Sequence, residues 1–158
     1  MTSDVAAARA ARRTVLQDGR AKAYRPMPAT ARRLAFAAGL AAYRRGDFFE
    51  AHELLEPAWM GTDDPAERDL YQGLIKLAAA YVHDVRGNPV GLAKNLLGAR
   101  RRLSAAGDSS RAETPTSGRA PRRRAETLDL PAIVRAIDER LAELEAGSAS
   151  VRLGPPAI

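Results

Sequence analysis

The sequence contains no cysteine, which excludes disulfides, thiolate zinc sites, iron–sulfur clusters and cysteine nucleophiles. Aromatic residues make up only 5% of the 158 residues, and alanine and arginine dominate over the large β-branched types. Because sheets favour β-branched and aromatic side chains, this composition indicates helices. With 46% hydrophobic residues, the chain can still build the core of a single domain.

Long hydrophobic runs are also missing. The longest run, residues 34–43, is about half of the ~20 residues that a membrane-spanning helix needs, and arginine pairs close both of its ends. The first 16 residues lack the apolar stretch of a secretory signal. We therefore expect a cytoplasmic protein that does not cross a membrane.

The net charge of +6 is concentrated outside the expected core. Residues 1–30 and 100–124 carry net charges of +4 and +6, and the remainder of the chain is slightly acidic. Such basic segments are typical of nucleic-acid partners, and the strongest cluster consists of Arg122, Arg123 and Arg124. No aromatic residue lies between these arginines to stack on a base, so a solvated segment is the favoured interpretation.

Cap residues, glycines and the spacing of apolar side chains predict an all-α fold, a compact bundle of about five helices. The expected helices cover residues 31–45, 48–56, 65–86, 90–103 and 130–146. Pro57 lacks an amide hydrogen, so the second helix should kink or end there. No segment alternates with period two for long enough to predict a strand.

The same patterns divide the chain into five parts. Residues 104–127 contain Ser, Thr, Gly, Pro and Arg but almost no large apolar side chain, and this composition is typical of a mobile linker. We expect a basic, partly disordered N-terminal extension (1–30), a helical core domain (31–103), the linker (104–127), a C-terminal helix (128–146) and a frayed tail (147–158).

One face of the second predicted helix combines polar and aromatic residues. At 100° per residue, His52 and Glu56 share this face with the aromatic residues Phe48, Phe49 and Trp59. A carboxylate on an apolar face is costly unless a cation, a donor or a metal accompanies it. His52 and Glu56 are one turn apart, so they can bind a metal together or form a hydrogen-bonded pair that fills a polar gap in the core.

The second histidine lies on the third predicted helix. Its apolar arc leaves a polar stripe on the opposite side, formed by Gln72, Lys76, Ala79 and His83. This stripe contributes to a site only if it faces another helix.

The segment from Gly46 to Trp59, GDFFEAHELLEPAW, resembles the hallmark of the bacterial and archaeal family known as domain of unknown function 309. That hallmark is a histidine, three residues, a glutamate, two residues, then tryptophan or tyrosine. A second block, from Gln72 through His83 to Gly87 and Asn88, is similar in order and spacing. The resemblance covers about residues 33–103.

The resemblance implies an all-helical domain with a metal site. The family's histidine and glutamate correspond to His52 and Glu56, its aromatic residue to Trp59, its second histidine to His83 and its turn asparagine to Asn88. We therefore predict a shared metal site of His52, Glu56 and His83, in a pocket lined by Phe48, Phe49, Trp59, Gln72 and Asn88. Mixed imidazole and carboxylate ligands suit zinc, manganese, iron or nickel.

Three hypotheses about function remain open. The first is a small metal-dependent hydrolase acting on an unidentified small molecule, with Glu53 as a candidate general base. The second is a non-catalytic helical interaction module in which His52 and Glu56 form a buried structural pair. The third is nucleic-acid binding by the arginine-rich segments, and it ranks last. Alanine-rich helix faces would also permit a homo-oligomer.

Overall fold

The computed structural model describes residues 14–112, 128–147 and 153–158. These residues form five helices and a small antiparallel sheet of two strands. The strands are β1 (Thr14–Gln17) and β2 (Arg20–Ala23), and the helices are α2 (Ala29–Arg44), α3 (Phe48–Met60), α4 (Pro65–Val85), α5 (Pro89–Ala112) and α6 (Leu130–Ala146). The prediction of a compact all-α bundle is confirmed.

Three helices begin at an aspartate that caps their free backbone amides. The side chains of Asp47, Asp64 and Asp129 accept hydrogen bonds from amides in the first turns of α3, α4 and α6. Between α2 and α3, Gly46 has a φ of 83°, a conformation that side chains other than glycine's rarely adopt. This glycine ends α2 and lets Asp47 begin α3 directly afterwards.

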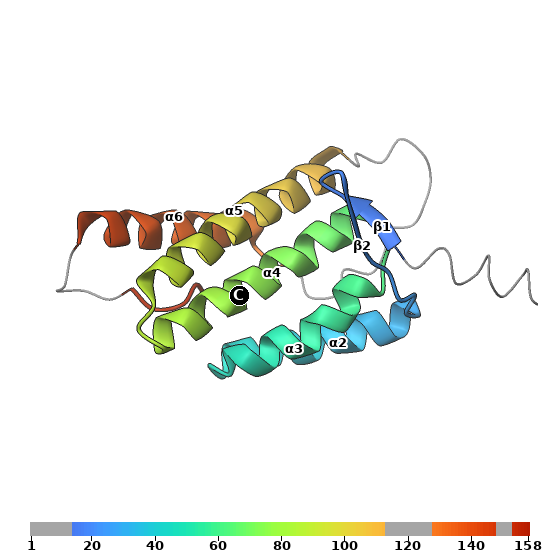
Figure 1. The fold of residues 1–158 in the computed structure, drawn as a ribbon, viewed down its shortest axis with the longest axis horizontal. Helices are drawn as coiled ribbons and strands as arrows, with labels where there is room; N and C mark the ends of the chain where they lie inside the picture. Colours follow the sequence, from blue (N-terminus) through green and yellow to red (C-terminus); the bar gives the residue numbers. More distant parts are fainter. Residues whose placement is uncertain (1–13, 113–127, 148–152) are drawn as a thin grey trace, which may run out of the picture.

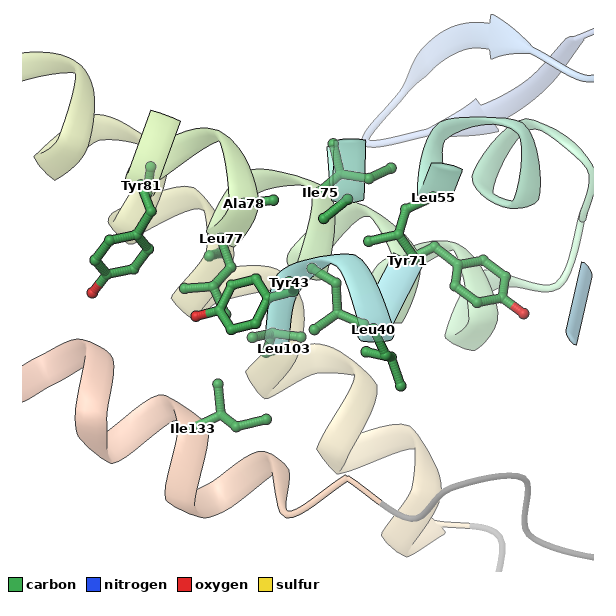
Figure 2. Close-up of a cluster of buried hydrophobic side chains, with 14 of the residues drawn as sticks. Leu40, Tyr43, Leu55, Tyr71, Ile75, Leu77, Ala78, Tyr81, Leu103 and Ile133 are labelled. Carbon is green, nitrogen blue, oxygen red and sulfur yellow. The ribbon is translucent and has the colours of Figure 1, made fainter. Parts of the chain in front are cut away.

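Helix α4 lies in the middle of the molecule, with α3 packed on one side and α5 on the other (Figure 1). Helix α2 packs against α3, and α6 lies along α5. The helices meet in one hydrophobic core (Figure 2), whose largest fully buried side chains are Tyr81, Leu40, Leu55, Leu74, Leu77, Leu92, Leu96, Leu103, Ile133 and Ile137. All five helices contribute to this core.

A buried arginine attaches α6 to the central helix. The side chain of Arg140 is only 4% exposed and forms ion pairs with Asp84 of α4, at 3.2 Å, and with Glu143 one turn further along α6, at 2.5 Å. Two buried or half-buried carboxylates thus compensate the charge of this guanidinium, as a buried cation requires.

The expectation that the chain contains no strand is wrong. Strands β1 and β2 pair in antiparallel register, and the turn between them consists of Asp18 and Gly19, both with positive φ. An Asp-Gly pair is the characteristic turn of a two-residue hairpin, so this dipeptide was the available signal. The hairpin was overlooked because four-residue strands are too short to establish an alternating pattern.

The expected boundary between the fourth helix and the linker is also wrong. Helix α5 continues to Ala112, so residues 104–112 of the predicted linker are helical. Leu103 and Ala106 on this helix are buried, and the hydrophobic contacts of α5 therefore extend its order beyond the predicted end. The rest of the predicted linker, including Arg122, Arg123 and Arg124, lies outside the described residues.

The end of the chain is packed where a frayed tail was expected. Pro156 is buried, and its carbonyl oxygen accepts a hydrogen bond of 3.0 Å from the hydroxyl of Tyr43. The side chain of Arg44 donates to the carbonyl of Ile158 at 2.8 Å. These two contacts hold residues 153–158 against α2.

Helix α3 does not end at Pro57 but continues to Met60. Ala58 is fully buried, and Trp59 is held by side chains from other elements, so tertiary packing outweighs the backbone hydrogen bond that proline cannot donate.

Among the described residues, no helix is both long and apolar enough to cross a membrane.

Candidate metal centre

Helix α3 positions the histidine and the glutamates of the motif. Its buried face consists of Ala51, Leu55 and Ala58, which pack into the core. His52 and Glu56 lie in the next row of side chains, one helical turn apart, and both are half-buried. The row is therefore shielded by the bundle while its polar atoms still reach the surface.

His52, Glu53 and Glu56 form a compact group of metal-binding side chains. One ligand atom from each residue can be chosen so that all three lie within 4.8 Å of one another. The Nδ1 atom of His52 is 3.2 Å from a carboxylate oxygen of Glu53. Because a carboxylate only accepts hydrogen bonds, the Nδ1 atom is the donor in this contact, and Nε2 is the other ring nitrogen that can bind a ligand.

The carboxylate of Glu56 is the most informative part of this group. Across the described ranges of the chain, no side chain or backbone amide donates a hydrogen bond to Glu56 and no cation pairs with it. Nearby Glu50 differs, because it pairs with Arg45. A half-buried carboxylate with no partner, next to a second carboxylate and an imidazole, is the arrangement that a cation would complete.

His83 occupies a different environment near the end of α4. Its Nδ1 atom lies 3.2 Å from the side-chain amide nitrogen of Asn88, and its ring packs on Gly91 at the start of α5. A Cβ atom at Gly91 would come within 2.5 Å of that Nδ1, so the glycine makes room for the imidazole. His83 is not part of the compact group on α3, and its role as a third ligand stays a prediction.

The residues predicted to line one pocket lie in four places. Phe48 packs between Tyr43 and Tyr81, with ring centroids at 5.2 and 5.5 Å, and so belongs to the core. Phe49 is 61% exposed. Asn88 lies beside His83, whereas Trp59 and Gln72 meet at the hairpin.

Gln17 is the residue through which Trp59 and Gln72 meet, and the sequence analysis missed it. Its buried side chain donates to the side-chain oxygen Oε1 of Gln72 at 2.7 Å and accepts from the Trp59 indole nitrogen at 3.2 Å. The guanidinium of Arg68 donates to the same Gln17 oxygen and lies over the Trp59 ring, 4.8 Å from its centroid. The Asp-Gly turn next to Gln17 was the only sequence signal for this contact.

These observations define the class of protein: an all-α bundle with a histidine and carboxylate cluster on one helix. Residues 36–95 match the model of the family described as "Domain of unknown function (DUF309)", so this part of the chain is similar to that family. The matched residues extend from the middle of α2 into α5 and contain the whole cluster. Neither a curated protein nor a solved structure matches the chain.

Proposed function

We propose that His52, Glu53 and Glu56 bind a divalent transition metal and that the protein is a metal-dependent hydrolase. The observation that carries the proposal is the unpartnered, half-buried carboxylate of Glu56 beside His52 and Glu53. The alternative of a structural pair between His52 and Glu56 has less support, because His52 bonds to Glu53 and its side chain is 32% exposed.

The donor set agrees with the metals expected from the sequence. One imidazole and two carboxylates suit zinc, manganese, iron or nickel. Three protein ligands leave coordination positions open, and a cation there would activate water or polarise a substrate carbonyl. Glu53 is 54% exposed, and a carboxylate that binds the metal cannot also accept the proton of the attacking water, so the role of general base is for Glu53 an alternative to that of ligand.

Elemental analysis of protein purified without a histidine tag or chelator tests metal binding. We expect about one equivalent of a transition metal in the wild-type protein, and its loss in His52→Ala and in Glu56→Gln. Glu50→Gln is the matched control, because Glu50 lies on the same helix but pairs with Arg45. A metal-free wild-type protein that takes up no metal on titration would contradict the proposal.

The His83→Ala variant measures whether the second histidine contributes. The sequence predicts that this variant loses the metal, whereas the grouping on α3 alone predicts that it keeps it. If metal is present, hydrolysis of phosphoesters, amides and carboxylic esters is then assayed with and without it. Absence of all three activities in the loaded protein would contradict the hydrolase assignment and leave the metal site intact.

A further inference from the structure

Lysine is rare in this chain, and the charges of two of its lysines act on the third. The sequence contains 22 arginines but only Lys22, Lys76 and Lys94. These lysines come from β2, α4 and α5, and the charges of Lys22 and Lys94 both act on the ammonium of Lys76. The few lysines of this arginine-rich chain, whose ammonium groups are compact and strongly hydrated, thus lie in one region.

A glycine on α5 makes room for Lys76. A Cβ atom at Gly98 would lie 2.8 Å from Cδ and 3.4 Å from Nζ of Lys76, so the lysine stem crosses α5 at this glycine. Lys94 precedes Gly98 by four residues and Arg101 follows it by three, so the three share one row of the helix. Lys76 therefore crosses α5 between two other cations.

The hairpin adds the third lysine from the side of β2. Lys22 pairs with Val15, so it points to the same side of the hairpin as Val15 and Gln17. Gln17 is buried against Gln72 of α4, one turn before Lys76. This packing directs Lys22 toward Lys76 on α4 and toward the row of Lys94 and Arg101 on α5.

The acidic residues nearby pair with arginines and not with the lysines. Asp69 and Asp18 both pair with Arg102, whose side chain is 9% exposed, and Asp18 also lies 3.8 Å from Arg101. In the parts of the chain that the structure describes, none of the three lysines forms an ion pair or a hydrogen bond. Burial, followed by repulsion from Arg102, Arg101, Lys94 and Lys22, lowers the pKa of Lys76.

We propose that Lys22, Lys76, Lys94 and Arg101 form a binding site for a small phosphoryl anion, such as a phosphate monoester or pyrophosphate. A half-buried ammonium without a counter-charge is costly, and an anion with several acceptor oxygens would compensate it. The site lies on α4, α5 and β2, whereas the metal cluster lies on α3. The two proposals therefore stand or fall separately.

Isothermal titration calorimetry with pyrophosphate, in a buffer without divalent cations, tests this site. We expect saturable binding to the full-length protein and an affinity about tenfold or more lower in Lys76→Gln, because a charge-assisted contact is removed. Arg33→Gln is the control for net charge. It removes one exposed cation from α2 and should leave the affinity within about twofold.

A second variant changes the shape of the site without changing its charge. Gly98→Ala places a methyl group where the Lys76 stem lies, so we expect weaker pyrophosphate binding in a protein that still folds. Carbon-13 labelling of lysine gives one set of Cε signals for each of the three lysines, and pyrophosphate should shift all three. Equal affinity loss in Lys76→Gln and Arg33→Gln, or no saturable binding, would overturn the proposal.

Discussion

At the scale of single residues, Lys76 is a half-buried cation without a counter-charge. The fold lowers its pKa, so the folded state releases this proton more readily than the unfolded state does. The charge therefore opposes folding at pH values below the folded pKa. That penalty decreases as the pH rises through the folded pKa and is gone above the unfolded pKa of about 10.5.

The Lys76→Met variant tests this consequence. We expect it to be more stable than the wild-type protein near neutral pH, and the difference to shrink as the pH approaches about 10.5. Urea unfolding, followed by circular dichroism at several pH values, measures the difference in free energy of unfolding. A difference that is constant or grows with pH would show that Lys76 is not destabilised by its charge.

At the scale of elements, the helices were predictable because their signals are local. Asp47 and Asp64 mark helix starts by their own side chains, and Gly46 marks a helix end by its backbone conformation. Contacts between distant parts of the chain determine the features that were missed. The position of β1 and β2 depends on the hydrogen bond between Gln17 and Gln72, which is 55 residues away in the sequence. No spacing rule predicts that contact.

The same distinction explains the candidate site. His52 and Glu56 could be paired from helical spacing alone, because both lie on α3. The relation between His52 and Glu53 was harder to predict, since adjacent residues on a helix point in different directions. The place of His83 depends on how α5 packs on α4 at Gly91, which the sequence does not reveal without a structure.

Gln17 should anchor the hairpin to the bundle. Gln17→Ala removes the hydrogen bonds to Gln72 and Trp59 and leaves their polar groups without this partner, so we expect a loss of about 1–3 kcal/mol in the free energy of unfolding. Trp59 is the only tryptophan, so its emission should shift to longer wavelength as the hairpin detaches. Leu16→Ala, at a neighbouring residue that is 78% exposed, should change neither quantity.

At the scale of the whole molecule, α6 returns to the bundle after residues 113–127, and its docking depends on buried charge as well as on the apolar residues Ile133 and Ile137. Arg140 links α6 to α4, because Asp84 on α4 and Glu143 on α6 compensate its charge. Removing one partner from a buried ionic group leaves the others uncompensated.

Arg140→Ala should therefore weaken the packing of α6 on the bundle more than the substitution of an exposed residue does. We expect a loss of about 3–5 kcal/mol in the free energy of unfolding and faster hydrogen exchange throughout α6. Arg135→Ala is the control on the same helix, since Arg135 is exposed. Exchange rates in α6 that are the same in the two variants would contradict this role of Arg140.

The central claim is that α3 carries a metal site at His52. The chain has only two histidines, so labelling with nitrogen-15 histidine gives two sets of ring signals, one from each histidine. During titration with Zn²⁺, we predict that the ring nitrogen signals of His52 shift and saturate near one equivalent, and that Glu56→Gln abolishes the shift. A His52 ring that stays unchanged at saturating Zn²⁺ would contradict the claim.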